Sequence, residues 1–446
     1  MRGWVSRGVL QNRGFLATLW VAILLLGAYR CFSYIRYDPH KPAPLTEEAV
    51  RLGHSLYQHG DFSNPFQTLD TGPSAHTSPG FPVLVAAIYR LTGDGANGRY
   101  ALQMTEATVV LIQIALLPIV MWSLGTSLFA GLLAGFLAAL GVRRAPTWEA
   151  NYVGLLLMLA TLLASRYCSA IQGTGGESRF FRSPWKIALA LGTLWGVILL
   201  TGPSTGSVWA SWVILGGWLS WRKGFRYAWL PILIMPLVLA APWEWRNYKL
   251  FHAIIPLRDS LGLELHISNN PCARVTFWEN WDNRNGQKCY AHPNDYPAEA
   301  QKVVELGEVA YNQLQLREAA EWIKSNPQRA ISLWIQRFKL FWFPQPGRLV
   351  AMWTIDLMTP AMLLGLLFLA RANRASATLL MTFVVVYPLV YYLIQAAERY
   401  RLPILWVTFG LAATALAAPL EWAFLHVDLC RRLLPSLDEH AFGKKS

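Results

Sequence analysis

Two acidic residues open a helix-forming stretch, 46–58, of this 446-residue sequence, and both can do proton chemistry. Glu47 stands four residues before Arg51, which is the spacing and order of an ordinary ion pair on a helix surface. Glu48 stands four residues before Leu52 and leans toward the face that the helix buries. Partial burial raises the pKa of a carboxyl group and makes it a better base near neutral pH. The alternative for Glu48 is a solvated acid that interacts with the positive end of the helix.

Three arginines stand at the ends of apolar segments, where they can meet an anionic group at a membrane surface. Arg246 lies in a Trp-x-x-Arg-Asn-Tyr stretch at 243–248, and Arg399 and Arg401 lie in Glu-Arg-Tyr-Arg-Leu-Pro at 398–403. A guanidinium group binds phosphate through two charge-assisted hydrogen bonds. An arginine at the end of a span is also a routine anchor, so this alternative stays open for Arg246.

Further polar residues flank these groups and are candidates to contact a substrate. His76 lies in a loop rich in glycine and proline at 71–82, although it can equally be a surface histidine. The other candidates are Tyr248, Asn269, Asn270 and Tyr400.

The elements that must position these residues belong to a membrane protein, because 54% of the residues are hydrophobic and only 15% are charged. A span needs about 20 mainly apolar residues, and each span must satisfy its own backbone hydrogen bonds. We predict an all-α polytopic protein with about ten spans. They lie near residues 15–35, 101–122, 126–142, 150–167, 187–203, 206–221, 227–243, 349–370, 375–395 and 402–424.

The basic residues predict the orientation of these spans. The net charge of +13 comes mostly from Lys and Arg in short loops, which is typical of cytoplasmic anchoring and does not favour nucleic-acid binding. Both termini are then cytoplasmic, while Arg399 and Arg401 lie outside against the usual bias, which favours a functional role. Five regions result: a tail and first span at 1–36, a first outer loop at 37–100, a bundle at 101–243, a second outer loop at 244–348, and C-terminal spans with a tail at 349–446.

Both outer loops have helical stretches. In the first, 81–91 is too short to span and is predicted to be an interfacial helix. In the second, 297–342 is predicted to be helical with a break at Asn326-Pro327. Cys272 and Cys289 share this loop, and we predict a disulfide, with two free thiols as the alternative. The sequence contains no cluster with metal-ligand spacing, so neither a metal nor a cofactor is expected.

Taken in order, these motifs resemble a known family. The stretches at 243–248, 269–271 (Asn-Asn-Pro) and 399–403, together with the loop from Glu48 to Pro82, are similar to bacterial GT-C glycosyltransferases. The resemblance is to the group of protein O-mannosyltransferases and lipid A aminoarabinose transferases. It implies a GT-C-type bundle with interfacial helices in two large outer loops, in the bacterial inner membrane with the active site on the outer face.

The resemblance also implies an inverting transfer of a sugar from a polyprenyl-phosphate donor to an acceptor hydroxyl or related group on a protein, lipid or glycan. Glu48 is then the general base, with Glu47 as second choice because the family's usual Asp-Glu is replaced here by Thr46-Glu47-Glu48. Arg246, Arg399 and Arg401 are expected to bind the donor phosphate. Membrane lipids are the other expected partners. The alternatives are a lipid or sugar transporter or flippase, and a cell-envelope polysaccharide ligase or polymerase.

Overall fold

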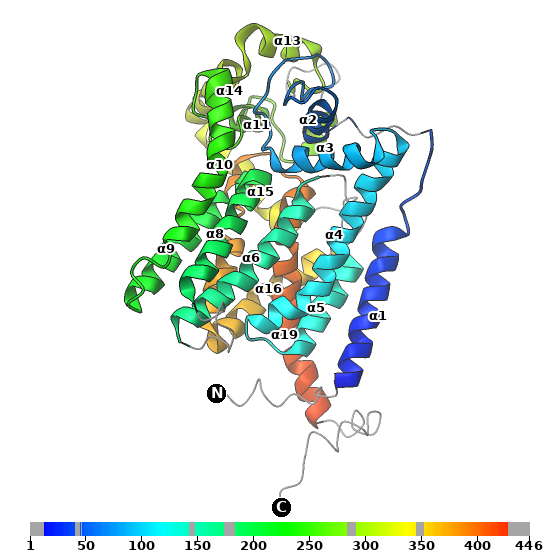
Figure 1. The fold of residues 1–446 in the computed structure, drawn as a ribbon, viewed down its shortest axis with the longest axis vertical. Coiled ribbons are helices and arrows are strands. Elements are labelled where there is room, and N and C mark those ends of the chain that lie inside the picture. Colours follow the sequence, from blue (N-terminus) through cyan, green and yellow to red (C-terminus); the bar gives the residue numbers. More distant parts are fainter. Residues whose placement is uncertain are drawn as a thin grey trace, which may run out of the picture.

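The computed structural model describes residues 13–40, 45, 47–141, 148–173, 183–282, 291–344 and 352–426. Within these ranges the regular secondary structure is helical, and β-type pairing is limited to two isolated bridges. Long helices run side by side as a bundle, and shorter helices form a cap at one end of it (Figure 1). The predicted all-helical class is confirmed.

The bundle consists of the long apolar helices. Their bounds are α1 Arg13–Phe32, α4 Ala96–Ser123, α5 Leu128–Gly141, α6 Ala150–Ile171, α8 Pro184–Thr201, α9 Gly206–Arg222, α10 Leu230–Phe251, α16 Met352–Ala372, α17 Arg374–Val385 and α19 Leu405–His426. Seven segments of the described chain are long and apolar enough to cross a membrane. Every predicted span coincides with a helix. The span predicted at 375–395 is interrupted before Leu389–Leu393 (α18), where Pro388 cannot donate a helical hydrogen bond.

The cap, as we use the word, consists of α2 (Glu48–Gln58), α3 (Gly80–Thr92), α11 (Leu261–Ser268), α13 (Pro297–Leu306) and α14 (Glu308–Ser325). Shorter elements and α15 join the cap to the bundle: η1 Pro203–Thr205, α12 Phe277–Asp282, α15 Pro327–Trp342 and η2 Glu398–Ile404.

The helices predicted in the two outer loops are present, and the break predicted at Asn326-Pro327 separates α14 from α15. A second break, at Gly307, was not predicted. Its φ of +82° suits glycine and divides α13 from α14.

Close packing of α2 against α3 fixes the position of the first outer loop. Leu52 of α2 is fully buried, as its spacing predicts, and Gly53 lies where two helix backbones nearly touch. A Cβ atom added at Gly53 would lie 2.6 Å from Cβ of Val85 and 2.8 Å from the carbonyl oxygen of Pro82. Glu48 begins this helix, so the same packing places its carboxyl group.

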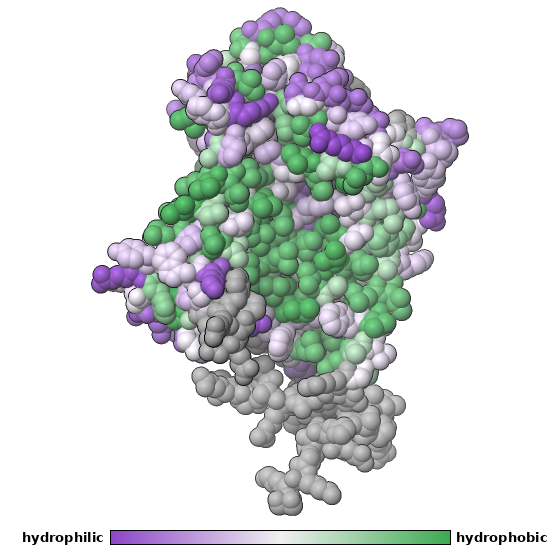
Figure 2. Space-filling model, viewed as in Figure 1, coloured by the Kyte–Doolittle hydropathy of each residue, from purple (hydrophilic) through white to green (hydrophobic). Residues whose placement is uncertain are grey.

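The surface of the molecule matches this division. Figure 2 shows a broad apolar surface over the bundle and a hydrophilic surface over much of the cap. Large apolar side chains such as Leu25, Ile214 and Leu237 are more than half exposed. Because so much apolar area is stable only against lipid, the bundle is the membrane part of this multi-pass protein. Helix α10 runs toward the cap, so Arg222 and Lys223, just before it, lie at the opposite end of the bundle (Figure 1).

Candidate active site

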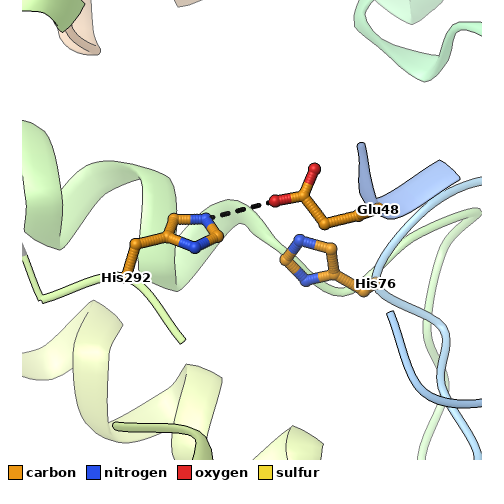
Figure 3. Close-up of side chains that lie close together, drawn as sticks. All are labelled: Glu48, His76 and His292. Carbon is orange, nitrogen blue, oxygen red and sulfur yellow. Dashed lines mark ion pairs between the residues drawn. The ribbon is translucent and has the colours of Figure 1, made fainter. Parts of the chain in front are cut away.

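Three side chains from distant parts of the chain meet within the cap. Glu48 is the first residue of α2, His76 lies in the loop before α3, and His292 lies in the segment before α13. Figure 3 shows the three side chains turned toward one another. Oε1 of Glu48 lies 3.7 Å from Nε2 of His292, and the two imidazole rings are 6.3 Å apart between centroids. The two outer loops therefore form one site.

Burial governs the protonation of Glu48, whose side chain is 17% exposed. It raises the pKa of Glu48 to about 7, with Glu264 and Asp295 adding to the rise and Arg399 opposing it. Burial also raises the pKa of Glu47, against the attraction of Arg399. A carboxyl group with a pKa near 7 exists in both protonation states at neutral pH, which is the property of an effective general base.

Burial has the opposite effect on the two histidines, because it lowers their pKa values. Burial, together with His292 and Arg258, lowers the pKa of His76 to about 3, and burial also lowers that of His292. Both rings are therefore neutral at physiological pH. Neither is a permanent cation for a phosphate group, so the positive charge of the site comes from arginine.

Arg399, one of the three predicted phosphate-binding arginines, lies among these acids. Its guanidinium group stacks over the ring of Trp148 at 4.0 Å from the centroid and lies 5.3 Å from that of Phe277. Its charge acts on both Glu47 and Glu48. Tyr400, also predicted, lies with its ring 5.6 Å from the same guanidinium group. Aromatic faces of this kind hold a guanidinium group in place while leaving its N–H groups for a ligand.

Glu149, which the sequence analysis did not select, also belongs to this site. It precedes the first turn of α6, beside Trp148. Burial raises its pKa to about 7, while Arg258 and Arg399 lower it and Glu47 raises it further. Glu149 is therefore a third carboxyl group, after Glu47 and Glu48, on which the charge of Arg399 acts.

Arg246, by contrast, holds the first outer loop against α10. Its Nη1 donates to the carbonyl oxygen of Ser74 at 2.7 Å, and its Nη2 donates to that of Phe62 at 2.9 Å. Its guanidinium group also lies over Trp243, 4.8 Å from the ring centroid. These contacts give Arg246 a structural task, and a phosphate would have to displace them.

Arg401 is buried and binds the end of a helix. Its Nη1 donates to the carbonyl oxygens of Phe341 and Trp342 at 3.3 and 2.9 Å, which are the last turn of α15. Its Nη2 donates to the hydroxyl groups of Thr359 and Thr408 at 2.9 and 3.1 Å. A cation suits the negative end of a helix, and these bonds occupy the guanidinium group.

The predicted asparagines form a buried joint. Asn269 is fully buried, and its Nδ2 donates to the carbonyl oxygens of Leu265 and Leu393, both at 2.9 Å. Its Oδ1 accepts from Nε1 of Trp334 at 3.2 Å and from Arg337 at 3.3 Å. The residue thus links α11, α15 and α18.

Its neighbour Asn270 donates to the carbonyl oxygen of His266 at 3.0 Å and accepts from the backbone of Cys272 at 3.1 Å. Tyr248, the remaining substrate candidate, is 49% exposed and stacks on Trp245. Cys272 is disulfide-bonded. Cys289 lies outside the described residues, so its pairing with Cys272 stays a prediction.

Glu48, His76 and His292 are of residue types that can bind a metal ion. Each offers a donor atom, and these atoms all lie within 4.8 Å of one another. A histidine that binds a metal through one ring nitrogen normally donates a hydrogen bond from the other. Here Nδ1 of His292 instead accepts from the backbone N–H of Asn294 at 3.0 Å, so Nε2 carries the proton toward Glu48. This donor set fits a metal poorly.

The groups that the sequence analysis missed are Glu149, Arg258, Glu264, His292 and Asp295. They come from four separate segments, and no spacing along the chain connects them. Their shared position on the predicted outer side was the one available indication. It cannot distinguish them from other polar loop residues.

The bundle and the cap define the class of protein, which is a polytopic, all-helical membrane protein. The structure aligns with the oligosaccharyltransferase of Archaeoglobus fulgidus, solved with a tethered acceptor peptide, at a TM-score of 0.53 and 13% identity over 94% of this chain and 51% of that chain. The chain thus spans about half of the length of that protein. The match shows the fold.

A second alignment is to ArnT from Cupriavidus metallidurans, solved with undecaprenyl phosphate, at a TM-score of 0.38 and 12% identity over 92% of this chain and 78% of that one. No family model and no characterised protein matches the sequence itself.

Proposed function

We propose that this protein is a membrane glycosyltransferase that moves a sugar from a polyprenyl phosphate to an acceptor. The observation that carries the proposal is the meeting of buried carboxyl groups with Arg399 in a cap at one end of an apolar bundle. A shared fold with an oligosaccharyltransferase supports the class of reaction. The motifs at 243–248, 269–271 and 399–403 support the lipid-linked donor.

In the proposed step, the carboxylate of Glu48 takes the proton of an acceptor hydroxyl as that oxygen attacks the anomeric carbon. The bond between this carbon and the phosphate oxygen breaks on the opposite side, with inversion. The bonding electron pair stays on the departing polyprenyl phosphate, whose new charge Arg399 stabilises. A fixed guanidinium group in a partly water-excluded site acts strongly on such developing charge.

The donor tail would lie along the apolar bundle, while its phosphate and sugar reach the cap. We place the cap on the outer face of a bacterial inner membrane. Basic residues such as Arg222, Arg371 and Arg374, which flank the ends of α9, α16 and α17, support this orientation through the positive-inside rule. The termini would then be cytoplasmic.

The test is to incubate the purified protein with a radiolabelled polyprenyl-phosphate sugar. Release of free polyprenyl phosphate together with labelled acceptor supports transfer. Movement of the intact lipid between leaflets without release would instead establish a flippase, and growth of a long polymer would establish a polymerase. Glu48→Gln should lower turnover at least about 100-fold, because general-base catalysis contributes that much. Glu305→Gln makes the same change at a solvent-exposed position of α13. It is the matched control and should leave turnover unchanged.

A further inference from the structure

Arg258 lies beside the candidate active site and has no role in the reaction described above. It belongs to the segment between α10 and α11 and is partly exposed. Among the described residues, its guanidinium group has no hydrogen-bond or ion-pair partner. Arg246 and Arg401, in contrast, are occupied by carbonyl and hydroxyl oxygens. Arg258 is therefore a cation available to a ligand.

A backbone contact of the neighbouring residue and the reach of its own charge place Arg258 at the site. The backbone N–H of the next residue, Asp259, donates to the carbonyl oxygen of Ala75 at 2.8 Å, immediately before His76. The charge of Arg258 lowers the pKa of His76 and that of Glu149. His76 belongs to the first outer loop and Glu149 precedes α6, and the charge of Arg399 also acts on Glu149.

A strained turn at residues 256–258 fixes the position of the Arg258 backbone. Leu257 has a φ of +70°, which is rare for a residue other than glycine. The backbone N–H of Arg258 donates to the carbonyl oxygen of Pro256 at 2.9 Å, which closes a three-residue γ-turn around Leu257. Such strain persists only where the surrounding structure imposes it, and it is concentrated at functional sites.

The surrounding structure here is the end of α10. Oε1 of Glu244 accepts from the backbone N–H of Leu257 at 2.7 Å, and Nε1 of Trp243 donates to the carbonyl oxygen of Leu257 at 2.8 Å. Both polar backbone groups of the strained residue are thus held by side chains of the 243–248 motif. This contact gives a physical reason for a Trp-Glu pair at the end of that helix.

We propose that Arg258 is a second cation of the donor phosphate site, acting with Arg399, and that Trp243 and Glu244 position it. The assignment rests on the proposed function. The charge of Arg399 acts on Glu47, Glu48 and Glu149, so one guanidinium group is shared among several carboxyl groups. A phosphate entering this site gains more from two arginines, because together they offer more charge-assisted hydrogen bonds to its oxygens than one does.

The first experiment measures binding of undecaprenyl phosphate to the purified full-length protein, without any sugar transfer. Arg258→Ala should weaken binding about tenfold or more, as expected for loss of hydrogen bonds to a charged group. Arg258→Lys should retain part of the affinity. Arg274→Ala removes an exposed arginine of the same outer loop and should bind as the wild type does.

The outcomes separate the two proposals. A wild-type protein that does not bind the lipid phosphate overturns the proposed function and this assignment with it. A wild-type protein that binds, with Arg258→Ala binding equally well, overturns only the role of Arg258.

The second experiment tests the positioning residues. Glu244→Ala should weaken binding of the lipid phosphate, whereas Glu244→Gln retains an oxygen for the N–H of Leu257 and should stay within about twofold of wild type. Leu257→Gly accepts the positive φ without strain and should also bind normally. Equal binding by Glu244→Ala and Glu244→Gln, at whatever level, would overturn the positioning role.

Discussion

Burial near other acidic residues raises the proton affinity of Glu48. The proposed activity should therefore depend on pH. Burial raises the pKa of Glu48 to about 7. A general base acts only when deprotonated, so kcat/KM should rise with pH and level off above the pKa. The measurement is a profile of kcat/KM across the pH range of about 5 to 9. A constant kcat/KM down to the acidic end would contradict a base with this pKa.

Glu149 differs from Glu48 in the charges that act on it, because both Arg258 and Arg399 lower its pKa, whereas Arg399 opposes the rise at Glu48. Its carboxylate attracts the two guanidinium groups that, in our proposal, the donor phosphate also contacts. Glu149→Gln should therefore lower kcat/KM about tenfold or more while the protein remains folded, since misplacing a charge-stabilising group costs that much. The assay is steady-state transfer alongside thermal unfolding. Normal kinetics in this variant would leave Glu149 with a purely structural part.

At the level of the helices, the contact between α2 and α3 fixes the position of Glu47 and Glu48 at the start of α2. Gly53→Val should lower both thermal stability and transfer, because overpacking a tight contact typically costs about 1–3 kcal/mol and pushes α2 away. Gly95→Ala is the control, since a Cβ atom there meets nothing within 4 Å. Thermal unfolding and transfer are measured for both. A fully stable and active Gly53→Val protein would show that this packing does not position Glu48.

Much of the helical architecture could be predicted because it is local. Runs of apolar residues predict the bundle, and the spacing of Leu52 and Gly53 predicts the buried face of α2. The turn at Gly307 was missed because an isolated glycine in a helical pattern is often tolerated. Glu48 and Arg399 became candidates through their chemistry and their places at a helix start and a span end, and the resemblance then supplied their expected roles.

The rest of the site depends on tertiary structure. His292 and Arg258 reach Glu48 and His76 only because α11, α13 and α14 fold over the end of the bundle. The ion pair predicted between Glu47 and Arg51 illustrates the same limit. Nε of Arg51 donates instead to the carbonyl oxygen of Asn64 at 3.3 Å, a contact that helix spacing cannot indicate.

For the molecule as a whole, we expect the cap to be accessible from outside the cell and the basic connections at the other end of the bundle to be accessible only from the cytoplasm. In a background without free cysteines, Lys302→Cys on α13 should react with a membrane-impermeant maleimide in intact cells. Lys223→Cys, which follows α9, should react only after the membrane is opened, because positive loops stay in the cytoplasm. The reverse pattern would put the site on the cytoplasmic face and remove the proposed location.

The joint around Asn269 affects how genetic data on this protein are to be interpreted. The amide side chain of Asn269 contacts three helical segments, although the sequence motif at 269–271 predicts a contact with substrate. A screen for inactive alleles would recover changes at Asn269 and at Glu48 with the same phenotype. Protein abundance in the membrane fraction should separate them, since a variant of Asn269 is expected to fail during biogenesis and a variant of the proposed base Glu48 to accumulate normally.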